Sequence, residues 1–354
     1  MQTDEVPARL PELEAFSQAF THLTQALERE VFGKHKQVQR SLICLVAGGH
    51  LLLDDVPGVG KTTLARALAG AVEDATTSRI QGTPDLLPSD IIGNSIYDRE
   101  TGEFTFRPGP VVANIVLFDE INRCAPRTQS AMLEAMQERR VTAFRHEQRL
   151  PDPFMVIGTQ NPQETLGTYP LPEAQLDRFL MRLTLGYPDR NPAREMLKAQ
   201  GSLVWGTPAS VTPERGIPAR QLRAMAEYAS RLPVADSVYD YLLDVIDATR
   251  NSPEVALGAS PRASAELLRA SRVNALLRWE RELGTGRIRG EPFLRPDDIR
   301  EIAVDVLAHR IVLSGARSTA DAQRDMMTRI IDDVRVPQDH TAHPATVRPR
   351  RFGT

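Results

Sequence analysis

Residues 51–63 read LLLDDVPGVGKTT, an apolar strand that runs into a glycine-rich turn ending in Lys-Thr and then into a helix. Gly58 and Gly60 allow successive backbone N–H groups to converge on one anion, and Lys61 can reach β- and γ-phosphates. The Thr62 hydroxyl can ligate Mg²⁺. The stretch therefore predicts a cradle for a nucleoside triphosphate, against the alternative of a plain turn between strand and helix.

One position of this cradle departs from the P-loop pattern G-x-x-x-x-G-K-[ST]. Asp55 stands where that pattern has its first glycine. A carboxylate that faced the phosphates would repel them. We therefore expect the Asp55 side chain to point away from the ligand.

Composition limits the class of protein. The chain has 354 residues, 41% of them hydrophobic and 25% charged, which is enough to bury two cores. The net charge of −3 provides no global field that would attract nucleic acid or an anionic membrane. Two cysteines, Cys44 and Cys124, indicate a reducing compartment and are expected to be small apolar fillers. With no signal-peptide core and no apolar run near the ~20 residues that span a bilayer, we expect a cytoplasmic protein.

The pattern of the chain changes at GYPDR, residues 186–190. Before this joint, short apolar runs alternate with helical patterns, which is typical of a parallel sheet wrapped by helices, and after it the patterns are helical. The predicted fold class is α/β, with a five-stranded parallel sheet and a second, all-α domain. The predicted strands are residues 51–54, 78–81, 115–119, 154–159 and 182–185. The predicted domains are a disordered arm (1–12), an α/β nucleotide-binding domain (13–188), a helical domain (189–334) and a disordered tail (335–354).

Two β-hairpins interrupt this pattern. The first is predicted from residues 94–97 and 103–107, and the second from residues 141–144 and 148–150. The second has charged residues of both signs: Glu138, Arg139, Arg140, Arg145, His146, Glu147 and Arg149. This hairpin either binds a polyanion or is a solvent-exposed ribbon of mixed charge. Phe144 is almost its only aromatic residue, which favours the solvent-exposed ribbon.

Two carboxylates follow the predicted strand at residues 115–119, where ligands of open α/β sheets bind. Asp119 would hold Mg²⁺, and Glu120 would polarise the attacking water. The alternative is two surface acids at the start of a loop. Asn161 follows the strand at residues 154–159 and could orient that water, although an Asn-Pro pair is often only a turn.

Two arginines are further candidates for the site. Arg262 lies in the first turn of a helix that Ser260 and Pro261 are expected to begin, where a cation opposes the helix dipole. This placement indicates either an anionic partner or a solvated arginine. Arg178 is a candidate arginine finger, with an internal pair to Asp177 as the competing explanation.

Five runs of the sequence, in this order and within about residues 27–311, closely resemble the MoxR family of AAA+ ATPases. They are RIQGTPDLLPSDIIG, FRPGPV, LFDEINRCAPRTQSAMLEAMQERRVT, GTQNPQETLGTYPLPEAQLDRFLM and LGASPRA. No single run is specific, but the ordered set is. Gly82 departs from the resemblance, because relatives often have a bulkier residue there.

The resemblance implies an AAA+ core with strands in the order 5-1-4-3-2, a helical lid and an oligomeric ring, usually a hexamer. It places the ATP-binding Walker A turn at Pro57, Gly58, Val59, Gly60, Lys61, Thr62 and Thr63. It places the Walker B acids at Asp119 and Glu120, sensor 1 at Asn161, the arginine finger at Arg178 and sensor 2 at Arg262. Val31, Phe32 and Gly33 match the segment that cups the adenine. The two hairpins match the helix-2 insert and the pre-sensor-1 hairpin of that clade.

The resemblance also implies a task. MoxR-like ATPases resemble chaperones that assemble or activate protein complexes, often with a partner that has a von Willebrand factor A domain. We expect an Mg²⁺-dependent ATPase that remodels a protein client. The alternatives are the motor subunit of a metal chelatase and a nucleic-acid motor, and the net charge and the mixed-sign hairpin count against the second. A plain metabolite kinase is least expected, because Arg178 and Arg262 suit hydrolysis between subunits.

Overall fold

The computed structural model describes residues 11–56, 58–97, 99, 102, 104–143, 146–161, 167–201, 216–285, 291–315 and 319–337. Pro57, Phe144, Arg145 and most of the predicted arm and tail lie outside these residues. The chain forms two compact units, described separately below. The sheet unit is Gln18–Ala226, and the helical unit is Met1–Ser17 with Glu227–Thr354. The predicted joint at residues 186–190 does not coincide with these limits, and the predicted domain boundaries stay predictions.

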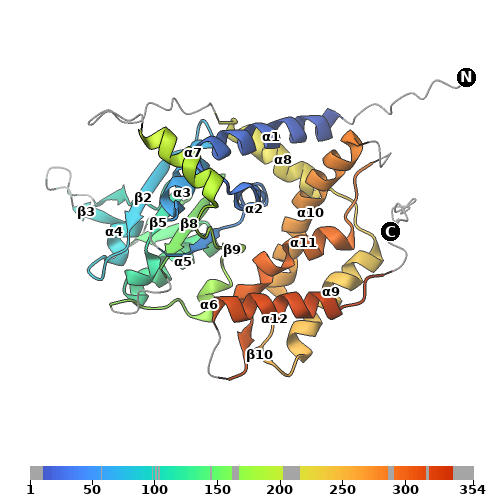
Figure 1. The fold of residues 1–354 in the computed structure, drawn as a ribbon. Helices are drawn as coiled ribbons and strands as arrows, with labels where there is room; N and C mark the ends of the chain where they lie inside the picture. Colours follow the sequence, from blue (N-terminus) through green and yellow to red (C-terminus); the bar gives the residue numbers. More distant parts are fainter. Residues whose placement is uncertain are drawn as a thin grey trace, which may run out of the picture. The chain divides into compact units, whose positions relative to one another are not determined.

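Five parallel strands form the main sheet of the sheet unit, in the order β2-β5-β8-β1-β9 (Figure 1). Read from β9, this is the predicted order 5-1-4-3-2, so the fold class and the strand order are confirmed. The strands are β1 (Leu51–Asp54), β2 (Thr77–Gln81), β5 (Ile115–Asp119), β8 (Met155–Gln160) and β9 (Met181–Leu183). The last strand is shorter than predicted because its pairing with β1 extends only from Met181 to Leu183.

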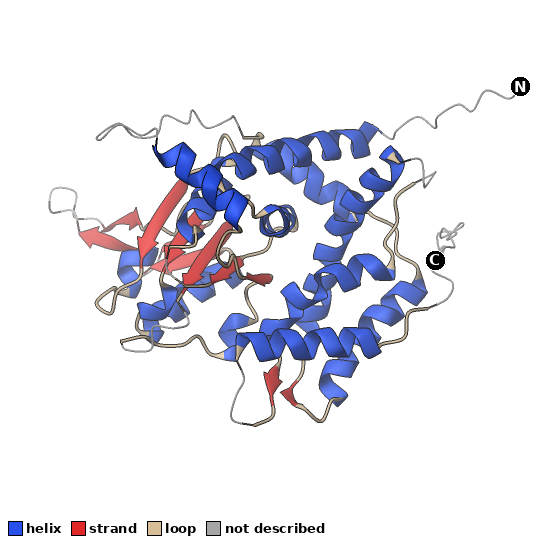
Figure 2. Cartoon of the chain, viewed as in Figure 1, coloured by secondary structure: helices blue, strands red, loops and turns tan. Residues whose placement is uncertain are grey.

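Strand β5 occupies a central position, and all five of its residues are buried. This burial explains its apolar run without alternation, which is typical of a strand covered on both faces. Figure 2 shows helices packed around the strands of this unit. They are α2 (His35–Val46), α3 (Lys61–Gly70), α4 (Pro88–Ile92), α5 (Pro126–Glu138), α6 (Glu173–Leu176) and α7 (Arg190–Gly201), while α1 (Pro11–Glu30) and α8 (Ala219–Ser230) contain limits of the units.

Both predicted hairpins are present as antiparallel pairs. The first joins β3 (Gly93–Tyr97) to β4 (Phe104–Pro108), and the second joins β6 (Arg140–Ala143) to β7 (His146–Arg149). The rings of Phe106 and His146 stack with centroids 4.7 Å apart, so the two hairpins are in contact.

The helical unit contains α9 (Asp236–Asn251), α10 (Pro261–Gly284), α11 (Pro296–Leu307), the short turn Ala308–Arg310 and α12 (Ala320–Asp333). The pair β10 (Val255–Leu257) and β11 (Val312–Leu313) adds a small antiparallel sheet that the helical pattern did not predict. The predicted start of α10 is confirmed, because the Ser260 hydroxyl accepts a hydrogen bond from the Ala263 N–H at 3.2 Å and Pro261 follows it.

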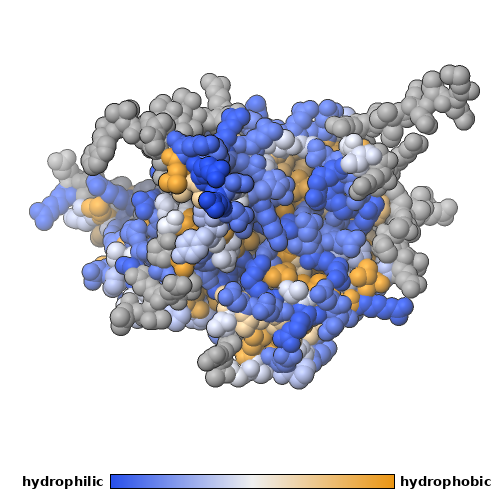
Figure 3. All heavy atoms as spheres, viewed as in Figure 1, coloured by the Kyte–Doolittle hydropathy of each residue, from blue (hydrophilic) through white to orange (hydrophobic). Residues whose placement is uncertain are grey.

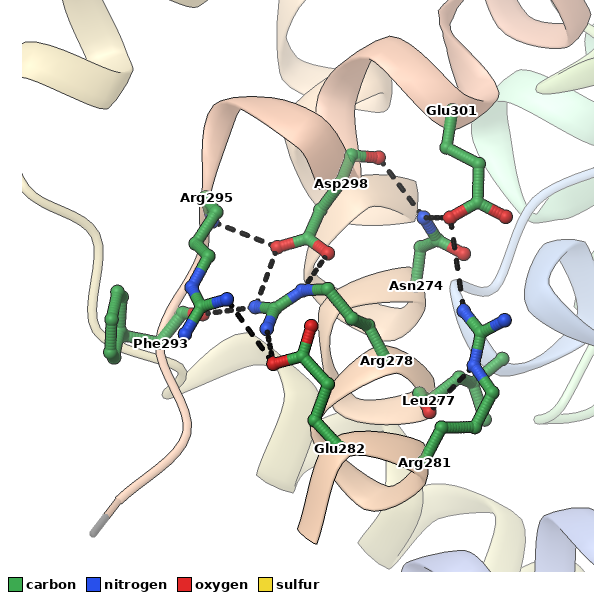
Figure 4. A network of polar contacts seen from close by, with 9 residues as sticks. All are labelled: Asn274, Leu277, Arg278, Arg281, Glu282, Phe293, Arg295, Asp298 and Glu301. Atoms are coloured by element: carbon green, nitrogen blue, oxygen red, sulfur yellow. Dashed lines mark hydrogen bonds and ion pairs between the residues drawn. The ribbon is translucent and has the colours of Figure 1, made fainter. Parts of the chain in front are cut away.

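A buried network joins α10 to α11 in the helical unit (Figure 4). The Arg278 guanidinium donates from Nε to Oδ1 of Asp298 at 2.6 Å and from Nη2 to Oδ2 at 3.0 Å. Glu282 accepts from Nη1 of Arg278 at 3.1 Å, and the Arg295 backbone N–H donates to Asp298 at 2.8 Å. Burial alone would lower the pKa of Arg278, but Asp298 and Glu282 raise it above its usual value. The guanidinium therefore stays charged inside the unit.

The face drawn in Figure 3 is mainly hydrophilic, with apolar residues in small separate groups. Within the part of the chain that the structure describes, every helix is too short or too polar to cross a bilayer. Cys44 and Cys124 are both buried, as expected for small fillers, and burial raises the pKa of the Cys124 thiol to about 11.

Candidate active site

A cavity of about 380 Å³ lies in the sheet unit where β5 ends and α3 begins. It is lined by Gly58, Gly60, Lys61, Thr62, Thr63, Arg79, Gln81, Asp119, Glu120, Thr159 and Asn161. The eleven residues come from four separate segments of the chain, and eight of them are sequence-predicted site residues. The cradle, the two acids and the amide of Asn161 therefore share one space.

The turn before α3 has the backbone that a phosphate cradle requires. Gly58 and Gly60 have φ values of 82° and 95°, in the left-handed region that favours glycine. Helix α3 begins directly after Gly60. The first N–H groups of a helix have no partner within the helix and carry its positive dipole end. The turn thus presents unpaired donors to an anion in the cavity.

Lys61 is held beside the cavity by backbone oxygens. Its Nζ donates to the carbonyl of Gln160 at 2.7 Å and to the carbonyl of Asp55. Partial burial lowers the pKa of Lys61 below its usual value, although nearby carboxylates, Asp55 first among them, act in the opposite direction. The ammonium group is therefore positioned by neutral acceptors that an incoming phosphate can replace.

The Asp55 carboxylate is bound by backbone N–H groups. Oδ1 accepts from the Val56 N–H at 2.7 Å, and Oδ2 accepts from the Gly186 N–H. Asp55 is buried, and both of its carboxylate oxygens have partners. The carboxylate thus fastens the cradle to the segment after β9, which agrees with the expectation that it points away from the phosphates.

Asp119 is buried at the end of β5 and is bound through both oxygens. Oδ2 lies 2.8 Å from Nε and 2.8 Å from Nη2 of Arg79, on the neighbouring strand β2. Oδ1 accepts from the Thr159 hydroxyl at 3.3 Å. The same hydroxyl oxygen accepts from the Glu120 N–H at 2.9 Å, so β8 fixes the backbone between the two acids.

Glu120 has a φ of 54°, which is uncommon for a residue other than glycine. Its carboxylate accepts from Nε2 of Gln81 at 2.9 Å and lies 3.2 Å from Nε of Arg123. Gly82 makes this conformation possible. A Cβ atom there would lie 2.2 Å from the Glu120 carbonyl oxygen, and the Gly82 N–H donates to the Asp119 carbonyl at 2.7 Å. A side chain at position 82 would therefore require the backbone at Glu120 to shift.

Comparison with known proteins agrees with this geometry. Residues 50–181 match the family described as ATPase family associated with various cellular activities (AAA), and residues 247–333 match the AAA lid domain. The chain is 40% identical to Chaperone MoxR1 of Mycobacterium tuberculosis, over 88% of this chain and 81% of that protein. It is 33% identical to Protein MoxR of Paracoccus denitrificans, over 84% of this chain and 89% of that protein. The chain belongs to the MoxR family of AAA+ ATPases.

Two further relatives extend the comparison. This MoxR-family chain is 43% identical to the uncharacterized protein YeaC of Bacillus subtilis, over 89% of this chain and 94% of that protein. The crystal structure of a Cytophaga hutchinsonii protein assigned as an ATPase superposes with a TM-score of 0.78 at 32% identity, covering 92% of this chain and 97% of that one. The MoxR-family protein is accordingly a chaperone-like AAA+ ATPase that binds and hydrolyses a nucleotide.

Several predicted site residues of this MoxR-family ATPase lie elsewhere. Val31, Phe32 and Gly33 are not among the described residues that line the cavity. Gly33 has a φ of 67° and packs so closely on Pro192 that a Cβ atom would lie 2.3 Å from its Cγ. Arg178, which follows α6, is likewise absent from the described lining of its own chain's cavity.

Arg262 belongs to the helical unit and has a carboxylate partner there. Its Nε donates to Oε1 of Glu266 at 3.0 Å, one turn along α10. The other oxygen of Glu266 accepts from Arg310, whose side chain is fully buried. The sequence suggested an anionic partner or solvent for Arg262, and the structure provides an internal carboxylate.

Three cavity residues of the MoxR-family site were not predicted: Arg79, Gln81 and Thr159. Arg79 and Gln81 stand two positions apart on β2, so their side chains share one face of that strand. Two polar residues at this spacing, on a strand next to the one that ends in Asp119, were the sequence signal that could have identified them. Polar residues on an edge strand are usually only solvated, which is why the signal was not decisive.

Proposed function

We propose that this MoxR-family ATPase uses Mg²⁺-dependent ATP hydrolysis to remodel, assemble or activate a protein client. The observation that carries the proposal is the single cavity in which the phosphate cradle meets Asp119 and Glu120. In this assignment Lys61 and the turn before it bind the phosphates. Glu120 polarises the attacking water, and Asn161 orients it.

The donors at the cavity fit Mg²⁺, which prefers oxygen ligands. The Thr62 hydroxyl and the Asp119 carboxylate both line the cavity, and we assign them to hold the ion directly or through water. Bound Mg²⁺ would neutralise charge on the phosphates during transfer. The protein's own contribution is to fix both oxygens on rigid elements, the start of α3 and the end of β5.

We assign Arg178 to the nucleotide of a neighbouring subunit in a ring, with a hexamer as the expected size. In favour of this role, the described lining of its own chain's cavity does not include Arg178. Arg262 is assigned to the nucleotide of its own subunit as sensor 2. Val31, Phe32 and Gly33 are assigned to the adenine.

The first hairpin supports a protein as the client. It exposes Ile96, Tyr97 and Phe104, with 44%, 53% and 60% of each residue accessible to solvent. The Tyr97 and Phe104 rings lie 5.2 Å apart between centroids, so the two strands of this hairpin present a small aromatic surface. Apolar surface of this kind suits contact with a protein chain. A partner with a von Willebrand factor A domain is the class that we would examine first.

The experiment uses Glu120→Gln, which should bind ATP and stall before hydrolysis, and Lys61→Ala, which should not bind ATP. Proteins retained by Glu120→Gln with ATP, but not without ATP and not by Lys61→Ala, would be clients. Replacing Tyr97 and Phe104 by serine in the Glu120→Gln chain should reduce that retention. If retention is the same with and without ATP, the proposed coupling is wrong.

The same preparations address the alternatives. A net charge of −3 predicts weak binding to random DNA at physiological salt, and ATPase activity that DNA changes little. Tight, salt-resistant DNA binding with strong stimulation of hydrolysis would favour a nucleic-acid motor. Retention of a metal-inserting enzyme by Glu120→Gln would favour the chelatase motor.

A further inference from the structure

Arg79 and Asp119 form an ion pair with one fixed partner and one accessible partner. The Asp119 side chain is 6% exposed and is held at the end of a buried strand, whereas the Arg79 side chain is 60% exposed. Strand β2, which carries Arg79, lies at the edge of the sheet. The carboxylate cannot move far, but the guanidinium can swing into the cavity that it lines.

The two nitrogen contacts of Arg79 fall on the same oxygen of Asp119. Nε and Nη2 each lie 2.8 Å from Oδ2, while Oδ1 faces the Thr159 hydroxyl. A divalent cation that approached Oδ2 would meet a guanidinium already bound there. Two positive charges on one oxygen repel each other strongly in a partly buried site. Arg79 and a metal ion therefore compete for Asp119.

The cavity also offers Arg79 a second partner. The Arg79 side chain lines the same cavity as the phosphate cradle. Its planar guanidinium presents a fork of N–H donors that matches phosphate oxygens. A triphosphate in the cradle would bring negative charge into that space at the moment when Asp119 is needed for the metal ion. Transfer of the guanidinium from carboxylate to phosphate would then leave Oδ2 open.

We propose that Arg79 is an exchangeable counter-ion of the magnesium carboxylate. Without nucleotide it occupies Oδ2 of Asp119 and excludes free divalent cations, and with Mg·ATP bound it moves to the phosphates. The inference rests on the proposed function, because it takes Asp119 as the Mg²⁺ carboxylate. It adds that metal ion and nucleotide enter together, since the ion alone is kept out.

The experiment measures binding of Mn²⁺, as a spectroscopic substitute for Mg²⁺, to nucleotide-free protein by electron paramagnetic resonance. Arg79→Gln should bind Mn²⁺ at one site per chain at least about tenfold more tightly than the parent, because a charged competitor at hydrogen-bond distance is gone. The double variant Arg79→Gln with Asp119→Asn should lose the site. Arg66→Gln, which removes an exposed arginine of α3, should behave as the parent. Equal Mn²⁺ affinity in Arg79→Gln and the parent would overturn the proposal.

A second measurement tests the phosphate contact. In the Glu120→Gln chain, adding Arg79→Gln should weaken binding of ATP at saturating Mg²⁺ by about tenfold, since one charge-assisted contact to phosphate is lost. Unchanged affinity would contradict the transfer. If Arg79→Gln does not fold, Arg79→Lys replaces it in the experiment. Arg79→Lys should give an intermediate Mn²⁺ affinity, because lysine keeps the positive charge but lacks the planar set of N–H donors of the guanidinium. If Lys61→Ala and Glu120→Gln behave as assigned while Mn²⁺ does not distinguish Arg79→Gln from the parent, the proposed function stands and only the counter-ion role falls.

Discussion

The sheet unit and the helical unit each contain an arginine bound to a buried aspartate, but the two pairs have different surroundings. In the helical unit the Arg278 and Asp298 side chains are 11% and 0% exposed, and the remaining donors are taken up by Glu282 and the Phe293 carbonyl. In the sheet unit Asp119 is also buried, with 6% of its side chain exposed, but its arginine partner lines an open cavity.

The difference separates a structural ion pair from one available for chemistry. A guanidinium enclosed on all sides has nowhere to go, and breaking its pair leaves a buried charge without compensation. A guanidinium beside a cavity can exchange its carboxylate for another anion, with water as an intermediate partner. Glu266 takes part in one ion pair of each kind. It pairs with Arg310, whose side chain is fully buried, and with Arg262, which is partly exposed.

The largest expected effect concerns Arg178, which we assign to the nucleotide of a neighbouring subunit. Arg178→Ala should bind ATP nearly normally and hydrolyse it roughly 10³–10⁵-fold more slowly, because a finger neutralises charge that develops only in the transition state. Specific activity of the parent should rise with protein concentration as subunits meet. Steady-state hydrolysis and equilibrium nucleotide binding measure the two quantities, with Arg66→Ala as the matched control.

Mixing variants separates the role of Arg178 from that of Arg262. Arg178→Ala mixed with Lys61→Ala should regain some activity, since one interface can combine an intact finger with an intact cradle. Arg262→Ala mixed with Lys61→Ala should regain none, because no subunit then has both a cradle and a sensor. Recovery in the Arg262 mixture with none in the Arg178 mixture would show that the two roles are reversed.

The next largest effects are those of two substitutions inside the cavity, one expected to affect hydrolysis and the other ATP binding. Glu120→Gln should keep ATP binding and lower the rate of hydrolysis by about 10²–10⁴-fold, the usual contribution of a general base. Lys61→Ala should raise the dissociation constant for ATP by at least about 100-fold, through lost charge-assisted contacts to the phosphates. Isothermal titration and phosphate release give both numbers. Parent-like binding and hydrolysis in both variants would mean that the cavity is not the site.

A third prediction tests the enclosed pair. Asp298→Ala should lower the free energy of unfolding of the helical unit by about 3–5 kcal/mol, because it leaves Arg278 buried and charged without its main partner. Trp279 is buried next to Arg278 and reports on this unit when Trp205 is replaced by phenylalanine. Urea unfolding followed by Trp279 fluorescence measures the change. A loss below about 1 kcal/mol, the range of surface pairs, would contradict the structural role.

The features that were predictable from the sequence are those that depend on residues adjacent in the chain. The glycines of the cradle, the apolar run of β5 and the Ser260 cap each follow from a few consecutive residues, and the structure places them accordingly. The partners of charged groups were not predictable in this way. Asp55 finds the Gly186 N–H 131 residues away, and Arg79 finds Asp119 across 40 residues. Such contacts depend on which distant segments become neighbours in the fold, which a few consecutive residues do not specify.

The smallest expected effect is on the stability of the open pair. Arg79→Gln should change the free energy of unfolding of the sheet unit by less than about 1 kcal/mol, although Asp119, like Asp298 in the helical unit, is buried. The reason is that Asp119 lines a cavity from which water can solvate it once the guanidinium is gone, whereas the Arg278 and Asp298 side chains are only 11% and 0% exposed. Urea unfolding in the absence of nucleotide, followed by far-ultraviolet circular dichroism, gives the value, with Arg66→Gln as the control for loss of one exposed charge. If Arg79→Gln lowered the free energy of unfolding as much as Asp298→Ala does, the Arg79–Asp119 pair would be structural. The two ion pairs would then not differ in the way argued above.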